Sequence, residues 1–247
     1  TVSRFERVVI ETSGLADPVP ILQTLMIDDV ITGQMKLARV VTVIDAVNGV
    51  RTLQRQQEAR RQLAVGDHLI VSKSDLVDYR SNELDGIIDD INRSAPIDCV
   101  SKGRVDPDVL FPAGSSVTNA AAIASSLSAN DHHTHRHSDI TTFAIVRERP
   151  IAAVALSLFL EALADHCGAD LLRMKGIVDV AESPGQPAVI HGVQHVFQSI
   201  DWLHAWPGDD QRTRIVFIGR DIHQAWVSAL LHAIETEVDE QAASRSP

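Results

Sequence analysis

The sequence predicts two consecutive domains. The first is an α/β domain with a mostly parallel sheet and helices on both faces, and the second is an α+β domain with a largely antiparallel sheet. Short β-branched runs alternate with helical patterns over residues 1–113, which is typical of parallel sheets. Over residues 139–240, three strand patterns follow one helix in succession, which favours antiparallel pairing. Residues 114–138, rich in Ser, Ala, Asn and His, predict a linker between the two domains.

Each element of the first domain follows from its own pattern. Apolar, β-branched runs predict strands at residues 6–10, 38–45, 67–72 and 97–100. Helical patterns cover residues 18–26, 50–65 and 81–93. Asp17 and Pro18 begin the first helix as N-cap and first-turn proline, and Gly66 is expected to end the second. The third helix stops before Pro96, because the residue that precedes a proline disfavours helical geometry.

The sequence of the second domain predicts four strands and two helices. The strands are expected at residues 140–146, 171–180, 188–198 and 214–219. The helices are expected at residues 150–166 and 222–238, with Asp221 capping the second. The tail from Gln241 onward is expected to fray, as chain ends usually do.

Composition excludes several classes of function. The net charge of −11 argues against nucleic-acid binding, which needs concentrated Lys and Arg. The longest apolar stretch, residues 151–164, is shorter than the roughly 20 residues of a membrane span, so we expect no membrane partner. Cys99 and Cys167 lie far apart and are expected to be buried free thiols. Together with the absence of a secretory signal before the first strand, this predicts a cytoplasmic protein.

The first informative motif occupies residues 8–18, with the sequence VVIETSGLADP. An apolar run ends in Glu11, and Gly14 follows three residues later. In P-loop NTPases, a carboxylate at such a strand end holds Mg²⁺, often through water, and the glycine lets the backbone approach the γ-phosphate. This pattern alone favours the simpler interpretation, a strand followed by a tight turn.

A second motif makes nucleotide binding the stronger interpretation. Ser72, Lys73 and Asp75 lie at the end of a predicted strand, in the sequence SKSD. This resembles the guanine-reading [NT]-K-x-D element, in which the Asp accepts hydrogen bonds from guanine and the Lys stem packs over the base. Ser101 and Lys102 follow the next strand and fit the loop that closes over the base. The carboxyl ends of parallel strands are where such sheets bind ligands.

Residues 11–18, ETSGLADP, resemble the signature of the CobW family of P-loop GTPases. Residues 171–177, 192–195 and 213–221 resemble the C-terminal domain of that family. The resemblance implies a GTP-hydrolysing metallochaperone that delivers zinc, cobalt or iron to a client metalloprotein, with a possible homo-oligomeric state. It also implies that Glu11 organises Mg²⁺ and water and that Gly14 senses the γ-phosphate. Asp75 and Lys73 then select guanine.

The chain departs from the family pattern in three places. The phosphate-cradling motif G-x-x-x-x-G-K-[ST] and the family's C-x-C-C metal motif are both absent from the 247 residues. Ser72 stands where Asn is usual, and its hydroxyl replaces only part of what a carboxamide offers. We therefore expect an incomplete P-loop domain without its first strand and phosphate loop, inactive by itself. The alternative is a non-catalytic metal-buffering or partner-binding module with a degenerate nucleotide site.

A histidine cluster in the predicted linker is a second candidate metal site. In an extended segment, alternate side chains project to one side about 7 Å apart, and a flexible linker can bend to bring imidazoles onto one ion. A solvated polar linker explains the pattern equally well. The cluster comprises His132, His133, His135 and His137. His191 and His195 lie four residues apart in a predicted strand, about 13 Å, which is too far to chelate one ion.

Overall fold

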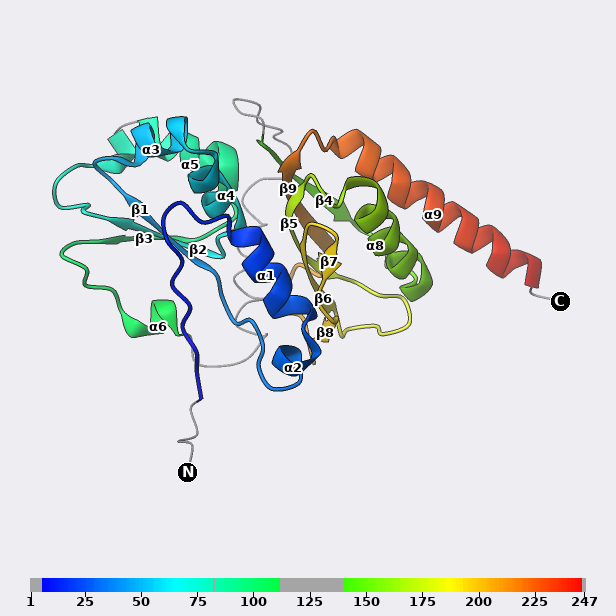
Figure 1. Cartoon of the computed structure of the whole chain (residues 1–247). Helices are drawn as coiled ribbons and strands as arrows, with labels where there is room; N and C mark the ends of the chain where they lie inside the picture. The colour runs from blue at the N-terminus through cyan, green and yellow to red at the C-terminus, as the bar shows by residue number, and fades with distance from the viewer. Residues whose placement is uncertain (1–5, 82, 112–139, 246–247) are drawn as a thin grey trace.

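The computed structural model describes residues 6–81, 83–111 and 140–245, and it contains two β-sheets (Figure 1). The smaller sheet is parallel, in the order β1-β2-β3, and the larger is antiparallel, in the order β4-β9-β5-β6-β7 with β8 beside β6. This confirms the predicted fold class in its two kinds of sheet, a parallel one with helices followed by an antiparallel one. The parallel strands are β1 (Val41–Asp45), β2 (His68–Ser72) and β3 (Ile97–Val100). The antiparallel strands are β4 (Ile140–Arg147), β5 (Leu171–Val178), β6 (Ala188–Val193), β7 (Val196–Phe197), β8 (Asp201–Trp202) and β9 (Thr213–Arg220).

The helices follow the predicted positions closely. Asp17 caps α1 as expected, because its carboxylate accepts a hydrogen bond from the backbone N–H of Val19 at 3.1 Å. Two short helices, α2 and α6, were not predicted. The helices are α1 (Pro18–Ile27), α2 (Asp29–Thr32), α3 (Gly49–Arg55), α4 (Gln57–Val65), α5 (Glu83–Asn92), α6 (Pro107–Leu110), α8 (Ala153–Cys167) and α9 (Gln224–Arg245), with a 3₁₀ turn at Tyr79–Ser81.

Helices α4 and α5 lie between the two sheets. Their buried side chains share one apolar core with residues of both sheets, such as Leu69 of β2 and Val216 of β9. Helix α4 contacts β5, and α5 contacts β4. The far face of the antiparallel sheet carries a second core beneath α8 and α9, where the rings of Phe143 and Phe217 stack at 5.1 Å. The order of layers is therefore sheet, helices, sheet, helices.

The predicted first strand does not form. Residues 6–10 pair with no described strand, and Val8, Val9 and Ile10 are 52%, 71% and 53% exposed. An apolar β-branched run becomes a strand only where a neighbouring backbone offers hydrogen bonds and a surface on which to bury it. No described segment supplies these beside residues 6–10.

Further boundaries differ from the prediction, three of them in a way that changes an element. Residues 50–65 form two helices, α3 and α4, because Gln56 is extended. Helix α4 ends before Gly66 as expected, but that glycine is needed for space rather than for a left-handed turn. A Cβ there would lie 2.7 Å from the Thr42 hydroxyl. Residues 188–198 form the β6–β7 hairpin instead of one strand, with Gln194 left-handed at φ 55°. The expected fraying from Gln241 is wrong, since α9 continues to Arg245.

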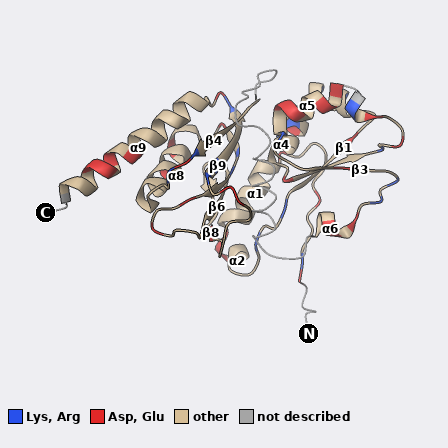
Figure 2. Ribbon diagram, turned by 180° about the vertical axis from the view of Figure 1, so that it is seen from behind, with Lys and Arg blue, Asp and Glu red and all other residues tan. Residues whose placement is uncertain are grey.

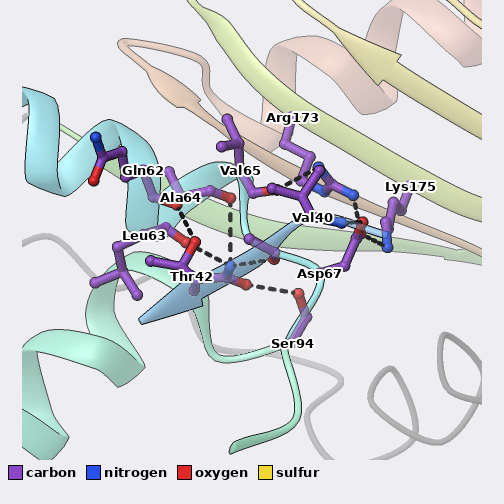
Figure 3. A network of polar contacts seen from close by, with 12 residues as sticks. Val40, Thr42, Gln62, Leu63, Ala64, Val65, Asp67, Ser94, Arg173 and Lys175 are labelled. Atoms are coloured by element: carbon purple, nitrogen blue, oxygen red, sulfur yellow. Dashed lines mark hydrogen bonds and ion pairs between the residues drawn. The ribbon is translucent and has the colours of Figure 1, made fainter. Parts of the chain in front are cut away.

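The C-terminal end of α4 is capped by side chains from three other elements (Figure 3). A helix leaves its last four carbonyls without partners inside the helix. Here Thr42 of β1, Asn92 of α5 and Arg173 of β5 donate to them. The accepting carbonyls belong to Gln62, Leu63, Ala64, Val65 and the adjoining Gly66. The Arg173 bond makes the end of α4 one of the places where the second domain donates a hydrogen bond to the first.

Asp67 completes this junction. Its carboxylate pairs with both Arg173 and Lys175 of β5 and accepts the backbone N–H of Val40 at 2.7 Å. Burial alone would raise the pKa of Asp67, but the two cations hold it well below its usual range. Burial also lowers the pKa of Lys175 to about 8, against the attraction of Asp67. His191, opposite Lys175 on β6, has its pKa lowered to about 3 by burial and then by that ammonium.

The described residues show the acidic character, the free cysteines and the lack of a long apolar helix that the composition indicates. Acidic residues outnumber basic ones along α5 and α9 (Figure 2). Both cysteines are free as expected, and Cys167 is buried, but the expected burial of Cys99 is wrong because Cys99 is exposed. No helix of the described part has the length and apolar character of a membrane span.

Replacing Asp67 with Asn is expected to lower the free energy of unfolding by about 3 kcal/mol, because two partly buried cations then lose their counter-charge. Urea denaturation followed by circular dichroism measures this. Asp89→Asn is the matched control: it breaks the more exposed i,i+4 pair with Arg93 at the end of α5 and should cost at most about 0.5 kcal/mol. Equal costs for the two variants would show that Asp67 does not carry the junction.

Candidate nucleotide site

The carboxyl ends of β1, β2 and β3 lie at one edge of the parallel sheet and are tied together by hydrogen bonds. The Ser72 hydroxyl donates to the carbonyl of Ile44 at 3.1 Å, and the N–H of Ala46 donates back to the carbonyl of Ser72 at 2.9 Å. On the other side, the Ser74 hydroxyl donates to the carbonyl of Val100 at 3.2 Å. The loop after β2 is therefore fixed between the loops after β1 and β3.

This arrangement brings together five of the predicted site residues. Ser72 ends β2, Lys73 and Asp75 stand on the loop that follows it, and Ser101 and Lys102 stand on the loop after β3. Asp75 is exposed, so its carboxylate is free to accept hydrogen bonds from a ligand. The hydroxyl of Ser72, which stands where Asn is usual, makes a local bond to β1.

Both loops contain a lysine in the left-handed backbone region. Lys73 has φ 60° and Lys102 has φ 50°, followed by Gly103 at φ 68°. For residues other than glycine this conformation is uncommon and costs of the order of 1 kcal/mol. Such strain gathers at binding and catalytic sites, where the surrounding structure enforces it. Sequence reasoning did not predict it.

Asp45 is a residue of this edge that sequence reasoning did not place in the site. It ends β1, and its carboxylate accepts a hydrogen bond from the Lys73 ammonium at 2.7 Å. Partial burial disfavours its charged form, but hydrogen bonds from Lys73, from the Asn48 side chain and from two backbone N–H groups lower its pKa. The signal was present in the sequence, since β1 ends in an acid just as the apolar run before Glu11 does.

Gly14 lies in a turn that is anchored to α4. The N–H of Ala16 donates to the carbonyl of Ser13 at 3.0 Å, and the Gln62 amide donates to the carbonyls of Ser13 and Ala16 at 3.2 and 2.8 Å. Asp17 forms an ion pair with Arg61. Among the described residues, no hydrogen bond links this turn to the loops after β2 and β3. The structure thus presents two separate groups of predicted site residues.

Neither packing nor backbone geometry requires a glycine at position 14. A Cβ built there meets no described atom within 4 Å, and the φ of Gly14 is not in the left-handed region. The close approach of a ligand to the backbone is a remaining reason for a glycine. Glu11, three residues earlier, is exposed and carries a carboxylate that is open to an ion.

The predicted metal ligands are not gathered in the described part of the chain. Within residues 6–81, 83–111 and 140–245, no three His, Cys, Asp or Glu side chains form a group that could hold a metal ion. The expectation that His191 and His195 share one strand is wrong, because His195 lies in the turn between β6 and β7. The histidine cluster lies outside the described residues: His132, His133, His135 and His137.

Two family models match this chain. The model described as "CobW/HypB/UreG, nucleotide-binding domain" matches residues 1–98, and "Cobalamin synthesis protein cobW C-terminal domain" matches residues 140–235. Together they account for both sheets. This chain belongs to the CobW family. The resemblance seen in residues 11–18 is thereby confirmed.

Several CobW relatives are named for zinc. The chain is 26% identical to zinc chaperone YjiA of Escherichia coli, over 92% of this chain and 70% of that protein. It is 27% identical to zinc chaperone CobW of a Sinorhizobium species, over 94% and 72% respectively. A stretch covering 30% of the chain is 40% identical to zinc-regulated GTPase metalloprotein activator 1 of Schizosaccharomyces pombe, of which it covers 18%.

A solved structure shares the CobW fold seen here. The Zn(II)-bound YjiA GTPase from E. coli superposes with a TM-score of 0.70, covering 94% of this chain and 71% of that one. A triple mutant of the same GTPase gives a TM-score of 0.71. Both are 24% identical in sequence to this chain, so the likeness concerns the fold.

Replacing Gln62 with Ala is expected to loosen the turn that holds Gly14, because two carbonyls of the turn lose their donor. The Ala16 amide should exchange its hydrogen about fivefold faster, as measured by NMR-detected hydrogen exchange. Gln54→Ala, which removes an exposed bond to Glu83, serves as the control and should leave this amide unchanged. An unchanged Ala16 amide in the Gln62 variant would contradict the anchoring.

Proposed function

We propose that this chain serves in the GTP-dependent delivery of a transition metal to a client metalloprotein. The observation that carries the proposal is the edge of the parallel sheet. There the adjoining loops after β2 and β3 carry Lys73 and Asp75, and Lys102, respectively, in the pattern of a guanine-reading element. Zinc is the proposed cargo, because two relatives that are 26% and 27% identical to this chain are named zinc chaperones.

In this proposal Asp75 accepts hydrogen bonds from guanine, and the stem of Lys73 covers one face of the base. Ser101 and Lys102 close the other side. Gly14 senses the terminal phosphate through its backbone, and its turn passes the signal to α4 through Gln62. These roles agree with the exposure of Asp75 and with the free space around Gly14.

The residues present fit a magnesium ion held partly by a nucleotide. Mg²⁺ keeps several waters and takes one or two carboxylates together with substrate phosphates, so the single exposed carboxylate of Glu11 is a sufficient protein ligand. A bound ion there would neutralise charge on the phosphates. The protein's own part is to hold Gly14 in the turn that α4 anchors, with Glu11 three residues before it.

We expect the 247-residue chain by itself neither to bind GTP at micromolar concentration nor to hydrolyse it. Catalysis in this class consists mostly of positioning and charge stabilisation around the phosphates, and the sequence contains no G-x-x-x-x-G-K-[ST] motif to supply them. Isothermal calorimetry with GTP and Mg²⁺ and a phosphate-release assay measure both properties.

The comparison arm is the same chain extended at its N-terminus by a segment that carries a phosphate loop, which should bind and turn over GTP. Tight, Mg²⁺-dependent turnover by the 247-residue chain would show that its phosphate site lies in other residues. Failure of the extended chain would favour a non-catalytic metal-buffering or partner-binding module.

The histidine-rich segment is proposed to bind Zn²⁺ or Co²⁺ weakly. Neutral imidazole is the ligand and titrates near pH 6.5, so affinity should fall between about pH 7.5 and 5.5. Metal titrations of the intact chain and of a variant with four alanines test this. Identical isotherms would contradict it. The variant replaces His132, His133, His135 and His137.

A further inference from the structure

The ammonium of Lys73 is held by a residue outside the guanine-reading motif. Lys73 lies on the loop after β2, and its Nζ lies 2.7 Å from Oδ2 of Asp45 at the end of β1. The side chain of Lys73 is 52% exposed and that of Asp45 is 29% exposed. The lysine stem thus bridges two neighbouring strand ends while remaining open to a ligand.

Asp45 is itself rigidly placed. Its Oδ1 accepts the backbone N–H groups of Val47 and Asn48 at 2.8 and 3.2 Å, and its Oδ2 accepts the Asn48 side-chain amide at 3.0 Å. A carboxylate that accepts several fixed donors has few alternative rotamers. The partner that it offers to Lys73 is therefore preorganised, unlike that of a freely rotating surface ion pair.

The backbone of Lys73 is fixed as well. Its φ of 60° is enforced by neighbours on both sides: the Ser72 hydroxyl bonds to β1, and Ser74 bonds to the end of β3. The N–H of Leu76 closes the turn by donating to the Lys73 carbonyl at 3.0 Å. With its backbone and its ammonium both held, only the four-carbon stem of Lys73 is left to present to a ligand.

We propose that Asp45 is a positioning residue for guanine recognition, acting through Lys73. By holding the ammonium toward β1, Asp45 keeps the lysine stem extended across the sheet edge as an apolar cover for the base. A free lysine would lose rotamer entropy on binding, and the ion pair removes part of that loss beforehand. This inference rests on the proposed guanine site, since it adds a residue to that site.

A double-mutant cycle on the 247-residue chain tests the inference. GMP and AMP are titrated into isotopically labelled protein at millimolar concentration, and dissociation constants are taken from NMR shifts of the loops after β2 and β3. Asp45→Asn should weaken GMP binding about fivefold. In a Lys73→Met background the same substitution should have no further effect on GMP binding, because its route to the base is already gone.

Asp201→Asn is the matched control. It breaks a second Asp–Lys ion pair, that of Lys36, and should leave GMP binding unchanged. Urea denaturation of every variant separates a binding effect from a loss of stability. A purely structural role of Asp45 would weaken GMP binding equally in the wild-type and Lys73→Met backgrounds, and that additivity would overturn the inference while leaving the guanine site intact.

The unsubstituted chain distinguishes failure of the site from failure of the inference. A preference for GMP over AMP supports the proposed guanine site. Equal or absent binding of the two nucleotides would overturn that site and, with it, the role assigned to Asp45. A preference for GMP that Asp45→Asn leaves unchanged would overturn the role of Asp45 alone.

Discussion

The carboxylate of Asp67 accepts bonds from two cations of the antiparallel sheet at a place from which water is largely excluded. A buried carboxylate of this kind is stable only with its partners in place, and the cations need it equally. Because Asp67 belongs to the parallel-sheet domain and Arg173 and Lys175 belong to the other, each domain supplies the counter-charge for this buried group of the other. The packing of α4 and α5 between two sheets depends on this mutual requirement.

Helix α4 connects this junction between the domains to the turn that contains Gly14. At its C-terminal end, Arg173 donates to the carbonyl of Val65 (Figure 3). Within the helix, Gln62 holds the turn that contains Gly14. Helix α1, which follows that turn, packs Val19, Leu22 and Met26 against α4 and the β6–β7 hairpin, and Gln23 donates to Gln194 at 2.9 Å. The proposed phosphate-sensing turn thus contacts the second domain through two helices.

The candidate site was predictable where it depends on strand ends and not where it depends on neighbours in space. Ser72, Lys73, Asp75, Ser101 and Lys102 were placed correctly at one edge because parallel strands bring their carboxyl ends together. Asp45 was not predicted as a site residue, although the strand that it ends is as evident in the sequence as the others. Its importance comes from the ion pair with Lys73, 28 residues away in sequence, which no local pattern encodes.

The sequence by itself determined the two kinds of sheet, most helix positions and the Asp17 cap, since these follow from hydrophobic periodicity and from hydrogen bonds between near neighbours. Only the tertiary structure decided whether residues 6–10 pair, where residues 188–198 turn, and which residues join the domains. The apolar run at residues 6–10 has the local pattern of a strand, yet it pairs with no described strand and lies exposed. A strand needs a partner backbone and a buried charge needs a counter-charge, and chain segments far apart in sequence supply both.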